Sequence, residues 1–233
     1  MGPLQGLRVL EIGDRGEVAG KLLADAGADV LRVEPPGGAA SRRLGPFAGD
    51  RPAVDASLRH AYLNSSKRGL TLDLASADGW GLWRRLVGLV DVVLDSSGPE
   101  ALDRLSAGYA SFGEYERLIW CSITPFGIHG PWRDWQVTDL ISMALGGPMN
   151  SSGYDDHSLP PIRPEGDHSL WMAGEYATSG ILVAVRQRRR TGQGQLLDVS
   201  IHEAVSATTE GACANWEYFR QISQRQTGRP APC

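Results

Sequence analysis

Residues 160–200 read PPIRPEGDHSLWMAGEYATSGILVAVRQRRRTGQGQLLDVS. A loop rich in proline and glycine leads into a long apolar segment, residues 169–188, and four arginines gather at residues 186–190. The turn at residues 191–194 contains two glycines and precedes a short aliphatic run at residues 196–199. Basic side chains are favourable at a helix C-terminus, and glycine often ends a helix. The stretch therefore predicts a long helix, a tight turn and a strand.

The N-terminal segment predicts one complete β-α-β unit. Residues 7–12 and 29–34 are aliphatic runs, typical of buried strands in a parallel sheet. Residues 18–26 between them predict a helix that ends near Gly27. Prolines and glycines at residues 35–38 stop the second strand. We expect the crossover of this unit to be right-handed.

Strand and helix patterns alternate along the rest of the chain. This alternation predicts an α/β fold with a doubly wound, mostly parallel, Rossmann-like sheet. We expect polar loops at residues 37–60 and 146–168. Further strands are expected at residues 70–74, 92–94, 117–124 and 196–199, and further helices at residues 78–90, 99–105, 138–145, 169–188 and 201–222.

Composition excludes several classes of partner. The net charge of −4 gives no broad basic surface for nucleic acid, and no apolar run reaches the ~18 residues of a transmembrane helix. Three cysteines are too few, and odd in number, for a disulfide framework, which predicts a reducing cytoplasm. The five histidines lack the spacing of a metal site. We expect a cytoplasmic protein with no metal and no nucleic-acid or membrane partner.

The first turn has three spaced glycines, Gly13, Gly16 and Gly20, and Glu34 ends the second predicted strand. In dinucleotide-binding folds, glycines admit a pyrophosphate to a helix N-terminus and an acid at this point binds the ribose. The spacing here is looser than in that fingerprint. An NAD-dependent oxidoreductase and a plain tight turn are both compatible with these residues.

Several ordered motifs resemble the family III CoA-transferases, the CaiB/BaiF group of formyl-CoA transferase type. Together they run from residue 3 to residue 200, so the likeness covers most of the chain. The matching stretches are PLQGLRVLE at residues 3–11, LLADAGADV at residues 22–30, NSSKRGLTLDL at residues 64–74, ALDRL at residues 101–105, CSITPFG at residues 121–127, TGQGQ at residues 191–195 and DVS at residues 198–200.

The resemblance implies a reaction. In this family an aspartate attacks an acyl-CoA thioester and forms a mixed anhydride, then an aspartyl-CoA thioester, and so passes CoA between carboxylic acids. CoA lies against the Rossmann-like domain. Leu72 and Arg104 match residues that contact CoA in the family. Lys67 and Arg68 are expected to position phosphates, or else form a solvated pair at the entry of a strand.

The chain departs from the family where the chemistry occurs. Leu170 stands at the position of the nucleophilic aspartate, and a leucine cannot ionise. Asp167, three residues earlier, is the best remaining catalytic carboxylate, although an acid before a helix is normally a cap. Thr138 replaces the histidine of the related racemases, which argues against racemisation.

The expected CoA groove is also altered. Ser96 and Ser97 replace a common Asn-Phe pair, and Pro35 replaces a common arginine. These changes remove a stacking surface for adenine and a phosphate contact.

The resemblance covers only the N-terminal half of the family chain. We expect residues 1–200 to form the large domain, and residues 201–233 to be a helix and linker toward a second domain. One hypothesis is a CoA-transferase that acts on acyl-CoA and carboxylic acids, as a homo- or hetero-oligomer with a CoA-transferase-like chain. An alternative is a catalytically degenerate subunit that stabilises or regulates a complete CoA-transferase.

Overall fold

A computed structural model describes residues 2–225 and contains a single six-stranded sheet. The strand order is β3-β2-β1-β4-β5-β6, and every neighbouring pair is parallel. This topology confirms the predicted α/β fold with a doubly wound parallel sheet. The strands are β1 (Arg8–Ile12), β2 (Asp29–Glu34), β3 (Arg68–Thr71), β4 (Val92–Asp95), β5 (Ile119–Thr124) and β6 (Leu196–Ser200).

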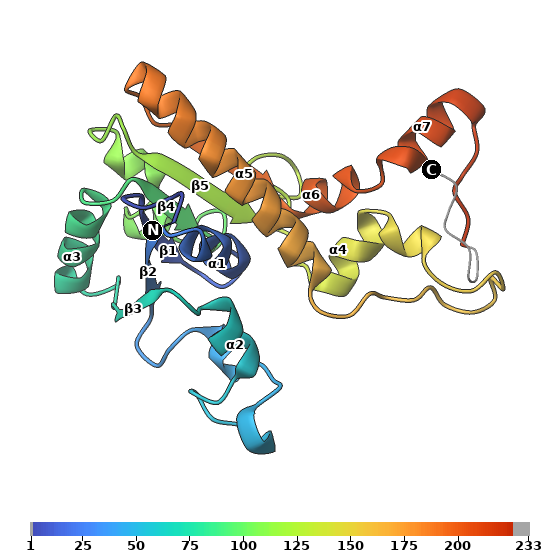
Figure 1. The fold of residues 1–233 in the computed structure, drawn as a ribbon, viewed down its shortest axis with the longest axis horizontal. Helices are drawn as coiled ribbons and strands as arrows, with labels where there is room; N and C mark the ends of the chain where they lie inside the picture. The colour runs from blue at the N-terminus through green and yellow to red at the C-terminus, as the bar shows by residue number, and fades with distance from the viewer. Residues whose placement is uncertain (1, 226–233) are drawn as a thin grey trace.

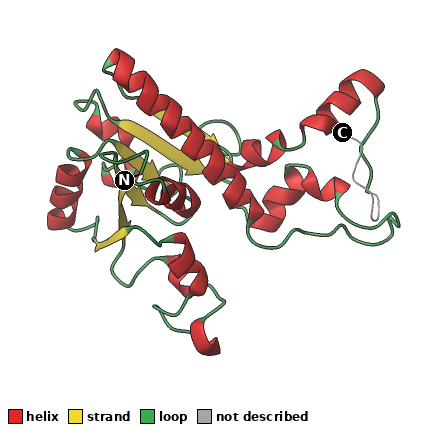
Figure 2. Cartoon of the chain, in the orientation of Figure 1, coloured by secondary structure: helices red, strands yellow, loops and turns green. Residues whose placement is uncertain are grey.

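Helices cover both faces of the sheet (Figures 1 and 2). The longest helix, α5 (His168–Thr191), lies across the sheet and packs against α1 (Glu17–Asp25). The other helices are α2 (Leu58–Leu63), α3 (Ala77–Val87), α4 (Asp139–Leu145), α6 (Ile201–Ala207) and α7 (Glu210–Phe219), with 3-10 turns η1 (Ala40–Arg43), η2 (Ala48–Asp50), η3 (Asp103–Leu105), η4 (Tyr109–Phe112) and η5 (Pro148–Ser151).

Two hydrophobic cores, one on each face, hold the layers together. Alternate residues of a strand point to opposite faces. Val9 therefore packs into the core beneath α1 and α5, and Leu10 into the core beneath α3. In β5, Ile119 joins the first core and Trp120 the second. Burial on both faces explains why the strands read as continuous apolar runs.

Two segments extend beyond this sandwich. The connection from β2 to β3 carries η1, η2 and α2 away from the sheet, below it in the view of Figure 1, and α7 projects at the upper right, beyond α6. Helix α6 still belongs to the packed layer, because Ile201, Ala204 and Val205 are buried. Helix α7 has no buried residue. The division at residue 200 stays a prediction, and residues 226–233 of the expected linker lie outside the described part.

Two predicted helices are wrong in extent. The segment 99–105 forms turns and the short 3-10 turn η3 instead of a helix, and Ser106 adopts left-handed backbone angles directly after it. The predicted helix 201–222 is broken into α6 and α7. Between them, the hydroxyls of Thr208 and Thr209 donate 2.7 Å hydrogen bonds to the carbonyls of Val205 and Ser206. Such side-chain bonds to nearby carbonyls bend or interrupt helices. No helix within residues 2–225 has the length and apolar character needed to cross a bilayer.

Candidate functional site

The carboxyl ends of the strands form the edge at which open α/β sheets bind ligands. The strand order reverses between β1 and β4, so the turns after these strands frame the central crevice. Gly13 follows β1 and lies against Ser96, where an added Cβ would come within 2.5 Å of the Ser96 carbonyl carbon. The Gly16 amide donates a 2.8 Å hydrogen bond to Ser96 Oγ. Ser96 therefore fastens the first turn to the end of β4.

Glu34, at the end of β2, is occupied by protein groups. Its carboxylate accepts hydrogen bonds of 2.6 and 2.8 Å from Arg42 and one of 2.8 Å from the Ala39 amide. The hydrogen bonds from Arg42 are the main reason that the pKa of Glu34 falls to about 2. Glu34 is already paired with Arg42, and Gly13 and Gly16 pack closely against Ser96. This geometry therefore disfavours the alternative of a nicotinamide site.

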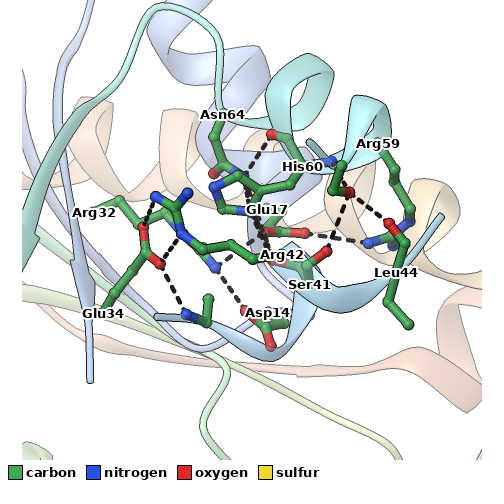
Figure 3. Close-up of polar contacts among 12 residues, drawn as sticks. Asp14, Glu17, Arg32, Glu34, Ser41, Arg42, Leu44, Arg59, His60 and Asn64 are labelled. Carbon is green, nitrogen blue, oxygen red and sulfur yellow. Dashed lines mark hydrogen bonds and ion pairs between the residues drawn. The ribbon is translucent and has the colours of Figure 1, made fainter. Parts of the chain in front are cut away.

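Glu17, the first residue of α1, is the centre of a buried polar network (Figure 3). Its Oε1 accepts hydrogen bonds from Ser41 Oγ at 2.6 Å and from Asn64 Nδ2 at 2.9 Å. The same oxygen lies 2.9 Å from Arg32 Nη2. Ser41 and Asn64 belong to the connection between β2 and β3. The network therefore fastens that connection to α1, and it supplies the partners that a buried carboxylate requires.

Lys67 lies inside the same network. Its ammonium is 2.8 Å from Glu11 Oε2, and it donates hydrogen bonds to Asn64 Oδ1 at 2.9 Å and to the Glu17 carbonyl at 3.0 Å. Burial raises the pKa of Glu11 and lowers the pKa of Lys67. The Lys67 side chain is only 1% exposed. This burial favours a structural role over the predicted phosphate contact.

Of the other predicted CoA contacts, Arg68 lines a cavity of about 290 Å³ together with Lys67 and Asn64 of this network. Arg68 forms an exposed ion pair with Asp29 at 2.7 Å, between β3 and β2. Leu72 is buried in the core beneath α3. Arg104, on η3, is mostly exposed and lies 3.4 Å from Glu100. The structure does not bring these side chains together with Asp167, and their roles stay predictions.

A small cavity of about 240 Å³ opens near η3, at the carboxyl ends of β4 and β5. Asp95 lines it together with Trp120 and Arg133. The Asp95 carboxylate accepts hydrogen bonds from the Ser97 amide at 3.0 Å and from Ser97 Oγ at 2.5 Å. Burial nevertheless raises the pKa of Asp95 to about 6. No sequence motif marks this acid, because its burial depends on the packing of η3 and β5.

Asp167 precedes α5 in an unusual conformation. Its backbone is left-handed, with φ 57° and ψ 46°, and its side chain makes no capping hydrogen bond. Instead, Asp139 Oδ1 accepts from the Ser169 amide at 2.9 Å and from Ser169 Oγ at 2.8 Å. The interpretation of Asp167 as a cap is therefore wrong, since Asp139 of α4 fills that role.

Arg59 of α2 holds the Asp167 carboxylate. Its Nε donates a 2.9 Å hydrogen bond to Asp167 Oδ2, and its Nη1 lies 3.5 Å from Glu17 Oε2. Arg59 thus links the start of α5 to the Glu17 network. Neither Arg59 nor Glu17 was expected at the site, because nothing in the sequence pairs residues so far apart.

Leu170 lies in the first turn of α5. Its amide donates a 3.0 Å hydrogen bond to the Asp167 carbonyl, and its side chain is partly buried against the core beneath α1 and α5. The Leu170 side chain contributes to packing, but it has no nucleophilic or ionisable group. The carboxylate nearest to it along the helix start is that of Asp167.

Among residues 2–225, no group of three or more His, Cys, Asp or Glu side chains is placed to hold a metal ion. The site thus consists of a charged network at the start of α1, a paired carboxylate at the start of α5 and polar turns at the switch point. This arrangement defines a Rossmann-like α/β domain with a carboxylate beside its crevice.

The family of the chain follows from its sequence. The model of CoA-transferase family III matches residues 4–232, and the chain belongs to this family. This match confirms the resemblance inferred from the motifs.

Individual relatives agree with that assignment. The chain is 36% identical to the succinyl-CoA:(R)-benzylsuccinate CoA-transferase subunit BbsE of Thauera aromatica, over 96% of this chain and 54% of that protein. It is 35% identical to the succinyl-CoA–D-citramalate CoA-transferase of Chloroflexus aurantiacus, over 99% of this chain and 56% of that protein. The crystal structure of a CaiB/BaiF family protein from Brucella suis matches with a TM-score of 0.89 and 30% identity, over 97% of this chain and 60% of that one. The chain spans about half the length of the curated relatives it matches.

Proposed function

We propose that the chain takes part in the transfer of CoA between an acyl-CoA and a carboxylic acid, as one chain of an oligomer. Membership of CoA-transferase family III supports the reaction. The observation that carries the proposal is the Asp167 carboxylate, which lies at the start of α5, one turn before Leu170, and is held by Arg59.

The proposed chemistry is nucleophilic catalysis by a carboxylate. Asp167 attacks the thioester carbonyl, the C–S bond breaks, and CoA leaves as a thiolate. The thiolate then attacks the Asp167 carbonyl of the mixed anhydride, which releases the first carboxylic acid and leaves an aspartyl-CoA thioester. The second carboxylate attacks this thioester, and the returning thiolate completes the exchange and regenerates Asp167. No step consumes a metal or a redox equivalent.

A catalytically degenerate subunit is the second candidate. Two observations favour it: Leu170 is partly buried and packs against the core, and Arg59 donates a hydrogen bond to Asp167. In that case a partner chain of the same family provides the nucleophile. This chain then contributes a Rossmann-like domain that stabilises or regulates the complete CoA-transferase.

A CoA-transferase-like partner chain is part of both proposals. BbsE is named as a subunit, and so is the alpha subunit of a succinyl-CoA–L-malate CoA-transferase from Chloroflexus aurantiacus, which is 30% identical over 96% of this chain. The names of two of the relatives described above contain succinyl-CoA. Succinyl-CoA is therefore the first acyl donor to test. We propose the cytoplasm as the compartment, since Cys121 and Cys213 are free thiols.

The decisive experiment traps the covalent intermediate. The chain is purified with its native partner, incubated with succinyl-CoA, quenched in acid and digested for mass spectrometry. A CoA adduct on Asp167, formed with loss of water, would establish the catalytic role. An adduct on an aspartate of the partner and none on this chain would establish the degenerate subunit instead.

A further inference from the structure

A groove of about 400 Å³ runs beside the C-terminal half of α5. This half of the helix points away from α4 and from the start of α5 (Figure 1). Pro3 and Leu4 of the N-terminal segment line the groove together with Leu182 and Val185 of α5. Leu182 is 41% exposed, whereas Val185 is buried and Leu4 packs against the core beneath α1 and α5. The groove is therefore lined by apolar side chains over part of its length.

Three arginines, Arg186, Arg189 and Arg190, line the same groove. Residues three and four apart lie on one face of a helix, so these side chains continue the row that begins with Leu182. All three arginines are exposed. Within residues 2–225, none of their side chains forms an ion pair or a hydrogen bond. The groove thus combines an apolar lining with three unpaired cations.

A neighbouring arginine shows what the fold itself requires at this end of α5. Arg188 is buried, and its Nη2 lies 3.2 Å from Asp91 Oδ1. Its Nη1 donates hydrogen bonds to the carbonyls of Asp91 and Arg117 at 3.1 and 3.2 Å. The helix dipole also favours cations in the last turn, but Arg186 lies before that turn. Neither effect explains why unpaired arginines surround an apolar groove.

We propose that this groove binds an acidic, extended segment of another protein chain, with an apolar side chain on Leu182 and carboxylates on the arginines. Charge complementarity indicates the partner, because this face presents three unpaired cations on a chain whose net charge is −4. Arginine binds carboxylates through two parallel hydrogen bonds. The groove is separate from the candidate nucleophile, since Arg186 lies about 28 Å from Asp167 along α5.

Helix geometry sets the spacing that the bound segment needs. Leu182, Arg186 and Arg190 are four residues apart, which is about 6 Å along the helix axis. In an extended segment, residues i and i+2 point to the same side and lie about 6.6 Å apart. The expected pattern is therefore apolar-x-acid-x-acid, in either chain direction. A groove accepts one extended chain better than a flat bilayer, and the negative net charge opposes nucleic acid.

Binding of a synthetic peptide tests the proposed docking site. The probe is a fluorescein-labelled peptide in which two aspartates alternate with serines and a leucine stands at each end. It is titrated with the full chain, and fluorescence anisotropy reports binding. We expect saturable binding that weakens at least tenfold when asparagines replace the aspartates, because the charge pairs are lost. Replacement of the leucines by serines is expected to weaken binding by about as much, because apolar contact is lost.

Substitutions in the groove assign the binding to these side chains. We expect Arg189→Gln and Leu182→Ala each to weaken binding of the aspartate peptide about fivefold, as for one exposed ion pair or one partly buried apolar contact. The triple variant Arg186→Gln, Arg189→Gln, Arg190→Gln is expected to weaken it about 100-fold. All of these side chains are at least partly exposed, and a thermal melt of each variant verifies that the fold is retained.

The matched controls are Arg85→Gln and Leu82→Ala on α3. Leu82 is 46% exposed, and Arg85 is exposed and forms no ion pair within residues 2–225. They therefore place a comparable leucine and arginine on one face of another helix, away from the groove. We expect both controls to leave the affinity for the peptide unchanged.

The docking site would be refuted if the aspartate peptide shows no saturable binding, or if the asparagine peptide binds equally well. An affinity that the triple variant leaves unchanged would refute it too. Phosphatidylglycerol vesicles and duplex DNA are tested in the same assay. If either of them binds through the three arginines and the peptide does not, the basic face serves a membrane or a nucleic acid instead. CoA transfer is measured separately, so failure here leaves the proposed function intact.

Discussion

The guanidinium of Arg59 donates a 2.9 Å hydrogen bond to the carboxylate of Asp167, across 108 positions of sequence. This bond joins α2, on the long connection from β2 to β3, to the beginning of α5. Through Glu17 it also reaches the charged network at the start of α1. Two segments, α2 and the start of α1, therefore hold the candidate nucleophile Asp167 in position. Neither segment contains one of the family motifs.

The role of Asp167 can be separated from that of Leu170 by two substitutions. We expect Asp167→Asn to lower CoA transfer by the purified complex about 100-fold or more, because a covalent nucleophile is lost. Leu170→Asp places a carboxylate one turn further along α5 and is expected to restore part of the activity when combined with Asp167→Asn. Initial rates with succinyl-CoA measure both. Full activity of the Asp167→Asn complex would assign catalysis to the partner.

The Arg59–Asp167 bond is expected to stabilise the fold. Arg59→Met should lower the free energy of unfolding by about 1–2 kcal/mol, because two carboxylates lose a charged hydrogen-bond partner in a half-buried position. Arg59→Lys should lose less. Urea unfolding at pH 7 measures the change, and a double-mutant cycle with Asp167→Asn isolates the pair.

The matched control for that experiment is Arg68→Met. Arg68 forms an ion pair with Asp29 at 2.7 Å, but both side chains are at least half exposed. Exposed pairs contribute roughly 0–1 kcal/mol. A loss at Arg68 equal to the loss at Arg59 would contradict a special structural role for the Asp167 contact.

Asp95 should make stability depend on pH between about 4 and 6. Its pKa is raised by burial from 3.8 to about 6, so the folded state binds the proton more tightly than the unfolded state. The stabilising effect of the protonated carboxyl is complete below pH 4 and is lost as pH rises toward 6. Asp95→Asn keeps an acceptor for the Ser97 bonds and carries no charge.

We therefore expect Asp95→Asn to be more stable than the unmodified chain at pH 7.5, by up to about 3 kcal/mol, and similar to it at pH 4. Thermal unfolding at the two pH values measures the difference. An equal effect of the substitution at both pH values would show that the ionisation of Asp95 is not its cause.

Gly20 should be intolerant of alanine for a reason of packing. An added Cβ there would overlap Glu11 Oε2 and lie 3.0 Å from Lys67 Nζ. Because Glu11 is fixed by Lys67 and Arg32, it cannot move aside, and we expect Gly20→Ala to cost about 1–3 kcal/mol. Gly81→Ala on α3 is the control, since its Cβ would meet nothing within 4 Å. Helix propensity predicts that this control gains about 0.5–1 kcal/mol.

The family and the layered fold could be predicted from the sequence. Aliphatic runs such as DVLRVE at residues 29–34 indicate strands buried on both faces, and the helices between them alternate regularly. The predicted strand at residues 29–34 agrees with β2 to the residue. Local periodicity is sufficient for such elements, because each one must bury its own apolar face.

Element ends and interruptions were predicted less well. The break between α6 and α7 depends on hydroxyl-to-carbonyl bonds from Thr208 and Thr209, and a strong apolar pattern conceals it. The end of η3 depends on one left-handed residue, Ser106. The break between α6 and α7 and the end of η3 each depend on the conformation of one or two residues. A hydrophobicity pattern averaged over a segment does not reveal them.

The sequence by itself determined that a parallel α/β sheet forms and that the chain is related to the CoA-transferases, and it predicts a leucine, Leu170, at the position of their nucleophile. Only the tertiary structure decided what surrounds that position. In the folded chain, Lys67 is buried in an ion pair with Glu11, and Asp139 accepts the capping hydrogen bond from the Ser169 amide at the start of α5. The carboxylate of Asp167 accepts a hydrogen bond from Arg59 instead. The reason is physical: desolvated charges must find partners, and those partners come from segments that are distant in sequence and meet only when the sheet has assembled.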